Sequence, residues 1–390
     1  MAFDIVIVGG GLSGLALAAE LAQAEFSHLK VLVLEQRQTY VRNRTWSYWK
    51  TPKTPPHRYS HLERQRWTQW RVQQGTRICQ QASPPVTSSG EAISYCTLDG
   101  DAFYSAALHA ILQSSHVELR LGISVRQIVG GDTPSVVTRD GEVIPAIWVF
   151  DARPPLQIRS SGLVQQFLGY EIQADHDVFD PGTVELMHFH PSSSGLHFFY
   201  VLPYSHRNAL VETTWISPAS FKPDFSAELQ PFIAALVGSA AYDVVYEEKG
   251  SLSLSDVTAR PASHVAPLGR GAGTLRASTG YAFLETLTHV EQIAASLKKY
   301  RGTGDLIDWP PPAFARSAVD EWMDTVFLKV LARDWSEGSA YFMQLFERVD
   351  TATMVAFLSG GANWRQRLSV ASALPTLPFA AQALSTFIGK

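Results

Sequence analysis

The spacing of hydrophobic residues changes twice within the first forty positions of the chain. Residues 3–8 form a continuous apolar run rich in β-branched side chains, which predicts a buried parallel strand. Residues 12–24 then carry leucine and alanine at helical spacing, and residues 28–34 predict a second buried strand that leads to Glu35. The glycine-rich segment before the helix completes a strand–turn–helix–strand order, which indicates the start of a βαβ unit.

Further along, apolar residues alternate in the manner of strands. Between residues 164 and 215 the alternation is clear at Phe198, Tyr200 and Leu202 and again around Glu212, and it predicts an antiparallel sheet. Residues 43–90 are rich in Pro, Trp and Arg and look like an insertion into the first fold. Helices are predicted at residues 101–112, 223–237 and about 285–300. Residues 317–357 are also predicted to be helical and are rich in aromatic side chains.

The glycines at the start of the chain form a Gly-x-Gly-x-x-Gly pattern between a strand and a helix. An acidic residue follows the last glycine by about 20 positions, where dinucleotide-binding folds place a carboxylate on the adenosine ribose. The free N–H groups at the helix N-terminus suit a pyrophosphate. No second glycine pattern follows, so we expect one FAD rather than FAD with a separate NAD domain. The predicted site comprises Gly9, Gly11, Leu12, Ser13, Gly14 and Glu35.

Together these patterns predict an α/β protein with a Rossmann-like FAD-binding domain, an antiparallel-sheet substrate domain and a helical C-terminal region. The FAD-binding domain is expected to be discontinuous, because the insertion and the antiparallel sheet interrupt it. The predicted boundaries are 1–45, 95–160 and 261–300 for the FAD-binding domain, 46–94 and 161–260 for the substrate domain, and 301–390 for the helical region.

Composition excludes several classes of protein. The 390 residues include 32 Lys and Arg against 36 Asp and Glu, a net charge of -4, so we expect no nucleic-acid partner. Cys79 and Cys96 are too few for a disulfide framework or a multi-cysteine metal site, and they fit a reducing cytosol. No charged-then-apolar leader is visible before residue 3, so we expect no secretory signal. Aromatic residues make up 11%, which favours a large core, with a large apolar cavity or a membrane-facing surface as the alternative.

Several short segments in the same order resemble the flavin-dependent lycopene β-cyclases of carotenoid-forming bacteria. The resemblance covers nearly the whole chain, and no one segment is specific alone. The similar segments are Asn43-Arg-Thr-Trp-Ser47, Asp151-Ala-Arg153, Phe167-Leu-Gly-Tyr-Glu171, Phe199-Tyr-Val-Leu-Pro203 with Leu210-Val-Glu212-Thr-Thr214, Arg276-Ala-Ser-Thr-Gly-Tyr281, and Phe357-Leu-Ser-Gly360 with Leu374-Pro-Thr-Leu-Pro-Phe379. By the same resemblance, Asp151, Gly269 and Gly280 are expected to join the FAD site.

Three positions depart from the pattern of that family. Pro154 stands where glycine is usual after the Asp-x-Arg turn, and Ala277 replaces a proline. His188 replaces an aspartate in the Leu186-Met187 segment, so we expect the loss of a carboxylate near the reaction centre to affect rate or end-group preference.

The resemblance implies an intramolecular lyase or isomerase that closes the linear ends of lycopene into β-ionone rings, toward β-carotene, with reduced FAD and without net redox change. An alkene is a poor base, so the acid must be a carboxyl kept protonated in a dry pocket. Glu212 is the catalytic residue implied, whereas Glu171 is equally suited to a structural ion pair. Trp46, Tyr48 and Tyr281 could stabilise the cation or merely pack. NAD(P)H is the expected reductant of the flavin.

The implied substrate also bears on location. A carotenoid is insoluble, so we expect cytoplasmic protein associated peripherally with the inner face of the cell membrane, where contact with other carotenoid enzymes would occur. Residues 368–389 carry no charge, but Pro375 and Pro378 argue against a spanning helix, and the stretch either lies at the interface or packs on the core.

Alternatives remain from the sequence. No carboxylate-rich or cysteine set accompanies His188, His190 and His197 in the sequence, so we predict no metal site. A flavin monooxygenase or halogenase would share the fold, although Leu268-Gly269-Arg270 lacks the usual Gly-Asp pair and Trp67-Thr-Gln-Trp70 lacks the halogenase continuation. A non-catalytic carotenoid-binding flavoprotein is the third hypothesis. Whether one or both ends are cyclised, and the oligomeric state, stay open.

Overall fold

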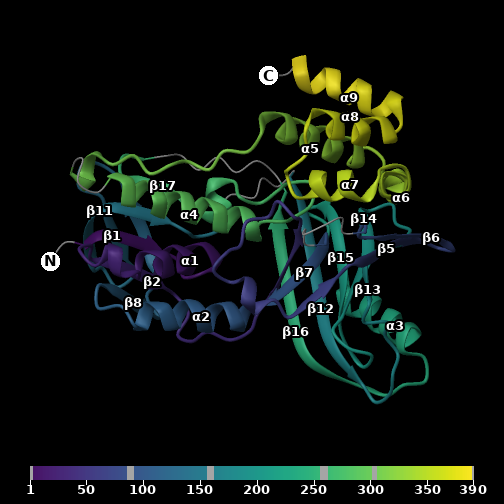
Figure 1. Cartoon of the computed structure of the whole chain (residues 1–390), viewed down its shortest axis with the longest axis horizontal. Helices are drawn as coiled ribbons and strands as arrows, with labels where there is room; N and C mark the ends of the chain where they lie inside the picture. The colour runs from purple at the N-terminus through teal and green to yellow at the C-terminus, as the bar shows by residue number, and fades with distance from the viewer. Residues whose placement is uncertain (1–2, 86–91, 156–161, 255–261, 301–304, 389–390) are drawn as a thin grey trace.

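A sheet of seven strands organises the part of the molecule that contains the N-terminus, as the computed structural model shows (Figure 1). The model describes residues 3–85, 92–155, 162–254, 262–300 and 305–388. The strands are, in order across the sheet, β8 (Val117–Leu121), β2 (Val31–Glu35), β1 (Phe3–Val8), β11 (Val143–Asp151), β10 (Ser135–Thr138) and β9 (Val125–Val129), with β17 (Val265–Pro267) also paired to β11. The strands β8, β2, β1, β11 and β17 are parallel, which confirms the buried parallel strands predicted at the start of the chain.

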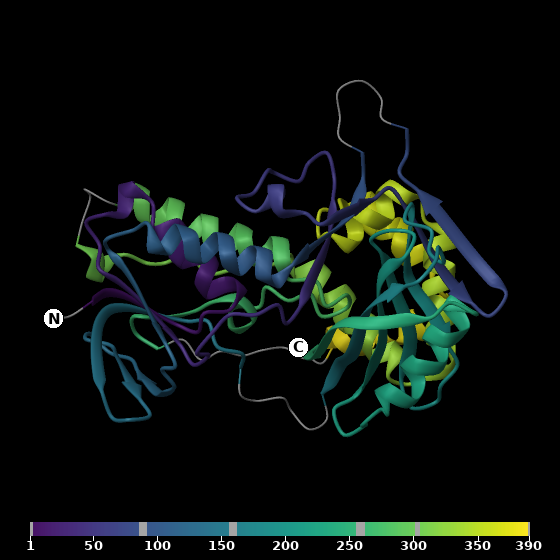
Figure 2. The ribbon, with the colours of Figure 1, turned by 90° about the horizontal axis from the view of Figure 1, so that it is seen from below.

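Three helices pack side by side on one face of this sheet, one below another in Figure 1 and overlapping on one side of the sheet in Figure 2. They are α1 (Leu12–Leu21), α2 (Gly100–Leu112) and α4 (Phe283–Tyr300). Their apolar faces bury Ile5, Ile7, Val31 and Val33, while Val6, Val8, Leu32 and Leu34 face the hairpin formed by β9 and β10. Residues that face the helices alternate with residues that face the hairpin along β1 and β2, because successive side chains of a strand point to opposite faces of the sheet.

Helix α1 is shorter than its apolar spacing predicts. It ends at Leu21, because Gln23 adopts an extended backbone and the chain turns through a 3-10 segment at Ala24–Phe26. A further turn, closed by the hydrogen bond from Leu29 N to Phe26 O, delays β2 until Val31 rather than residue 28.

A second sheet of seven strands is almost entirely antiparallel. Its strands are, in order, β16 (Tyr242–Ser253), β12 (Leu163–Ala174), β15 (Asn208–Pro218), β14 (Leu196–Pro203), β13 (Thr183–His190), β5 (Gln69–Gln74) and β6 (Arg77–Ala82). The antiparallel pairing of β14 with β15 confirms the sheet predicted from alternation around Glu212. Strand β5 joins β13 in parallel, so the insertion predicted at residues 43–90 contributes strands to this sheet.

Helices cover both faces of the second sheet (Figure 1). Helix α3 (Phe225–Val237), capped by Asp224, packs on one face. Four C-terminal helices pack over the other face: α5 (Ala318–Leu331), α6 (Gly338–Arg348), α7 (Thr351–Leu358) and α8 (Trp364–Ala373). The last helix, α9 (Thr376–Ile388), packs on α5. A small sheet of β3 (Thr45–Lys50), β7 (Ser94–Asp99) and β4 (Gln65–Trp67) lies between the two large sheets. The predicted α/β class is confirmed, and no helix within the described ranges is long and apolar enough to cross a membrane.

Candidate active site

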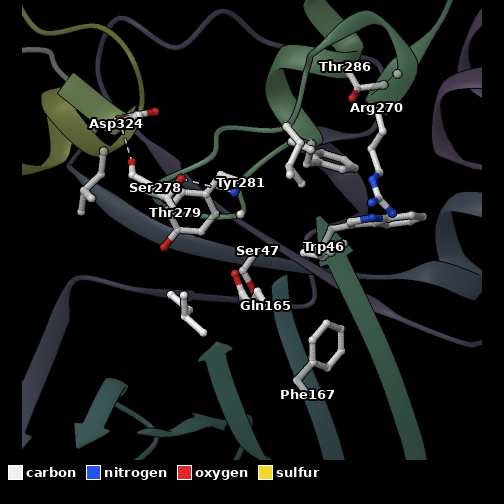
Figure 3. A pocket seen from close by; sticks show the side chains of 18 of the residues that line it. Trp46, Ser47, Gln165, Phe167, Arg270, Ser278, Thr279, Tyr281, Thr286 and Asp324 are labelled. Atoms are coloured by element: carbon white, nitrogen blue, oxygen red, sulfur yellow. Dashed lines mark hydrogen bonds between the residues drawn. The ribbon is translucent and has the colours of Figure 1, made fainter. Parts of the chain in front are cut away.

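One large cavity joins the first sheet, the second sheet and the C-terminal helices. Its volume is about 1760 Å³, which exceeds the roughly 300–1,000 Å³ typical of a pocket for one small ligand. Figure 3 shows Trp46, Ser47, Gln165 and Phe167 at this cavity, from β3 and β12. The size and the three-sided lining suit a dinucleotide together with a long second ligand.

The glycine turn after β1 forms one end of the cavity. Gly9 has a φ of +103°, and a side chain on Gly14 would lie 1.9 Å from the carbonyl oxygen of Gly9. Nothing lies within 4 Å of the position that a Gly11 side chain would take, so the helix N-terminus is open to a ligand. Gly9, Gly11, Leu12 and Ser13 line the cavity, and Gly14 supports the turn from behind.

Glu35 closes this end of the cavity at the end of β2. Its Oε2 accepts a hydrogen bond of 2.6 Å from Gly10 N, and its Oε1 accepts from Arg37 N at 2.8 Å. Burial raises the pKa of Glu35, but the hydrogen bonds and charge of Arg37 outweigh it and hold the pKa below its ordinary value. Glu35 is therefore ionised, lines the cavity, and fixes the turn at Gly10 as well.

The residues expected from the resemblance surround the same end. Gly269 has a φ of +61°, and a side chain there would come within 2.5 Å of Ser13 Oγ, while Gly280, with a φ of +73°, lies against Gln165. Both line the cavity. Asp151 ends β11, but its carboxylate pairs with Arg153 at 2.8 Å, and Arg153 rather than Asp151 lines the cavity.

Two cations that sequence reasoning missed also line this region. Arg44 and Arg270 make no ion pair within the described part of the chain. Burial, followed by the charge of Arg44, lowers the pKa of Arg270. In Figure 3 the Arg270 side chain runs toward Trp46. Arg270 is half-buried beside another cation, and among the described residues neither arginine has a carboxylate in an ion pair with it, which favours an anionic ligand. A signal in the sequence existed for Arg270, which stands where related hydroxylases have the aspartate of a Gly-Asp pair, and none existed for Arg44.

The second sheet presents Glu212 to the cavity. In β15, Leu210, Glu212, Thr214 and Ile216 line the cavity, whereas the residues between them face α3. Glu212 is 8% exposed. Burial, followed by the charge of Glu248, raises the pKa of Glu212 to about 8, although Thr214 donates a hydrogen bond to its Oε1. The Glu212 carboxyl is therefore mostly protonated at neutral pH.

A second carboxyl in this cavity, Glu248 of β16, was not found from the sequence. It is 4% exposed, and Tyr246 donates a hydrogen bond of 2.9 Å to its Oε2. Burial raises its pKa to about 7, against the opposing hydrogen bond from Tyr246 and the charge of Arg42. No sequence signal pointed to Glu248, because its place depends on how β16 pairs with β12.

The comparisons with known proteins agree with this geometry. The family model described as lycopene cyclase protein matches residues 4–384. The chain belongs to the lycopene cyclase family. A relative within the family, the lycopene beta-cyclase of Paracoccus sp. (strain N81106 / MBIC 01143), is 26% identical over 393 residues, which is 97% of this chain and 95% of that protein.

Solved structures with the same fold are more distant in sequence. A geranylgeranyl bacteriochlorophyll reductase-like protein from Thermoplasma acidophilum has a TM-score of 0.62 at 14% identity, over 97% of this chain and 98% of that one. The flavin-dependent monooxygenase PieE, solved with FAD and substrate, has a TM-score of 0.61 at 12% identity, over 98% of this chain and 73% of that one. The halogenase PltM has a TM-score of 0.60 at 15% identity, over 98% of this chain and 94% of that one. These likenesses show the fold that this member of the lycopene cyclase family shares with them.

Other residues that the resemblance singled out lie in different places. Trp46 and Tyr281 line the cavity, and Tyr281 Oη lies 3.3 Å from Tyr95 Oη. Tyr48 does not line it; its ring stacks on Phe283 instead. Glu171 forms ion pairs with Arg42 and Arg64 at 2.6 and 2.7 Å. Although burial raises the pKa of Glu171, these arginines lower it to about 2, as in a structural ion pair.

His188 is where this lycopene cyclase family member departs from expectation. Its ring contacts Phe232 of α3, with ring centroids 5.2 Å apart, so it lies on the face of the sheet opposite the cavity. Leu186 lines the cavity, and plain alternation would put residue 188 there too. A β-bulge between Glu185 and His188 reverses the facing, so the expectation that residue 188 lies near the reaction centre is wrong. Within the described ranges no group of three metal-binding side chains is present.

Proposed function

We propose that this chain is a lycopene β-cyclase, which closes the linear ends of lycopene into β-ionone rings without net oxidation or reduction. The observation that carries the proposal is Glu212, a carboxyl whose pKa is raised to about 8 in a largely apolar cavity. Membership of the lycopene cyclase family gives the substrate class. An acid for an alkene must stay protonated and dry, and few carboxyls in a protein meet both conditions.

In this mechanism the Glu212 carboxyl donates its proton to the end double bond of the polyene. The electron-poor carbon that results is attacked by a nearby double bond, which forms the ring, and a different C–H proton then leaves. Leu210, Ile216 and Phe198 exclude water that would otherwise capture the cation. The rings of Trp46 and Tyr281 line the same cavity and present π-electrons to positive charge.

FAD is the proposed cofactor of this cavity. The crowded glycines and the ionised Glu35 fit the adenosine and pyrophosphate half, and the cations Arg44 and Arg270 fit its phosphates. When bound in its reduced form, FAD would supply negative charge close to a developing carbocation, with NAD(P)H as the proposed source of its electrons. The residues expected at this site are Gly9, Gly11, Leu12, Ser13, Gly14, Glu35, Asp151, Gly269 and Gly280, with Asp151 acting through Arg153.

We further propose that the substrate reaches the cavity from a membrane surface at α8 and α9. Trp364, Leu368, Leu377 and Leu384 on these helices are 66%, 61%, 86% and 64% exposed. Residues 368–388 include no charged side chain. Other residues of the same helices, among them Phe379, line the cavity. Among the described residues, the one exposed charge beside these four on α8 is Arg365, whose guanidinium lies 5.3 Å from the centre of the Trp364 ring. An apolar surface with a cation at its edge lies favourably at a membrane interface.

The test is anaerobic incubation of FAD-loaded protein, reduced with dithionite, with lycopene in liposomes made in D2O. We expect cyclic carotenoid carrying one deuterium for each ring, because the Glu212 proton exchanges with solvent before it is donated. Glu212→Gln should give no rings while retaining FAD. Oxygenated or halogenated products that need O2 would instead favour the monooxygenase or halogenase hypothesis, and bound but unchanged lycopene would favour a carotenoid-binding flavoprotein.

A further inference from the structure

Glu212 and Glu248 approach one another across a glycine. Gly169 of β12 pairs with Glu212 of β15 on one side and with Glu248 of β16 on the other. A side-chain carbon on Gly169 would lie 3.5 Å from Glu212 Cβ and 3.3 Å from Glu248 Cγ. Because Gly169 has no side chain, the side chains of Glu212 and Glu248 close in on it from either side, and Leu210 Cδ1 lies 3.2 Å from the same position.

The surroundings of the two carboxyls differ. Glu248 accepts a hydrogen bond from Tyr246, whose ring carries the Arg42 guanidinium 3.8 Å from its centre. Arg42 and Arg44 favour the ionised form of Glu248, whereas no cation contributes in this way to Glu212. When the pair holds one proton, that proton therefore belongs on Glu212 and the charge on Glu248.

We propose that Glu248 is the base that completes the cyclisation, paired with Glu212 as its acid across Gly169. Glu212 gives its proton to an alkene carbon, where a C–H bond forms, and the ring C–C bond closes on the resulting cation. A C–H bond beside the new cation then breaks, its electrons form the ring double bond, and its proton passes to Glu248. After each ring closes, Glu248 releases its proton and Glu212 regains one by exchange with solvent, which restores the starting state without an oxidant or reductant.

The inference rests on the proposed cyclisation, but the pairing itself can be measured without turnover. Tyr200, Tyr204 and Tyr246 face the pair, and burial raises the pKa of each tyrosine above its ordinary value. The arginines at residues 42 and 44 stay charged, as arginine does in proteins. Among the carboxyls and tyrosines named here, Glu212 and Glu248 are therefore the groups expected to titrate between mildly acidic and mildly alkaline pH.

The first experiment is an infrared titration of the carboxyl bands in the FAD-loaded protein without substrate. Wild type should lose two buried carboxyl bands in two separate steps. Glu248→Gln should leave one band and lower the pKa of Glu212 by about one unit, because the repelling charge is gone. Glu247→Gln, which changes the exposed neighbour of Glu248, should change neither step. An unchanged Glu212 titration in Glu248→Gln would overturn the pairing.

The second experiment measures products with lycopene. Glu248→Gln should retain FAD but turn over about 100-fold more slowly, and its residual rings should carry misplaced double bonds, because no positioned base selects the departing proton. Glu248→Asp should partly restore the single isomer. Gly169→Ala, whose added carbon needs shifts of only a few tenths of an ångström, should slow turnover by separating the carboxyls.

The outcomes separate the two hypotheses. Normal turnover and a single isomer in Glu248→Gln would overturn the role of Glu248 and leave the cyclase proposal standing. No ring formation by wild type, with coupled titration intact, would overturn the cyclase proposal and with it the role of Glu248 as the base.

Discussion

Replacing Glu212 by glutamine should make the protein more stable while abolishing cyclisation. The pKa of Glu212 rises from 4.5 to about 8 in the folded protein. The folded state therefore holds this proton more tightly than the unfolded chain does, and the stabilisation that is complete below pH 4.5 is lost as the pH rises through about 8. Glutamine has no proton to lose, so the variant escapes this pH-dependent cost.

The size of the effect follows from the two pKa values. At neutral pH, ionisation of Glu212 lowers the free energy of the unfolded chain by about 3 kcal/mol more than that of the folded protein. Near pH 5 this difference is only about 1 kcal/mol. An unfolding entropy of about 2.1 cal/mol/K per residue converts 3 kcal/mol into a Tm increase of about 4 °C for a chain of this length. The Tm of Glu212→Gln should therefore exceed that of wild type by about 1 °C near pH 5 and about 4 °C at neutral pH.

The assay is thermal unfolding of FAD-loaded wild type and variant across this pH range, followed by tryptophan fluorescence. Glu247→Gln is the matched control, because Glu247 is exposed and its removal should give no pH-dependent difference in Tm. A Tm difference that stays constant with pH, or a variant less stable than wild type at neutral pH, would show that Glu212 is not a protonated buried acid.

Three further predictions concern the cofactor, the departure at residue 188 and the membrane. Glu35→Ala should bind FAD at least tenfold more weakly, as flavin fluorescence titration measures. Arg270→Gln should also weaken FAD binding, and it should raise the Tm of FAD-free protein in thermal unfolding, because it removes a half-buried cation that Arg44 repels. His188→Asp should leave the product ratio and rate unchanged in chromatographic assays, since the side chain faces α3. Replacing both Leu377 and Leu384 by serine should reduce sedimentation with neutral liposomes at high salt without loss of FAD, and equal sedimentation of wild type and variant would exclude α9 as the membrane contact.

The sequence predicted those parts of the site that depend on local pattern. The turn at Gly9 and the carboxylate at Glu35 follow from one strand–helix–strand unit, whose parallel strands the structure confirms. The cavity-facing position of Glu212 follows from alternation along a single regular strand. Where a strand is irregular the same counting fails, and the bulge before His188 is the example.

The sequence could not predict the parts that depend on pairing between distant segments. Glu248 lies opposite Gly169 only because β12 is hydrogen-bonded to both β15 and β16. Neither a lone glutamate in β16 nor a lone glycine in β12 carries a chemical signal. Arg44 and Arg270 come from segments more than 200 positions apart in the printed sequence, and only the fold brings both to one cavity.

The distribution of charged side chains in the cavity gives a physical reason for combining a nucleotide-binding fold with the C-terminal helices. Arg270 follows Gly269, which lies against Ser13 of the glycine turn, whereas Arg44 acts on Glu248 of the carboxyl pair on the second sheet. The residues of α8 and α9 that line the cavity are uncharged. An anionic cofactor is favoured beside the glycine turn and a hydrocarbon beside α8 and α9, so the two ligands would meet beside Glu212. In the proposed cyclisation, the low exposure of Glu212 would maintain its raised pKa. The same exclusion of water would strengthen attraction between the carbocation and any nearby negative charge. Moving the C-terminal helices away from the cavity would therefore admit water, which would lower the pKa of Glu212 and leave the carbocation less stable.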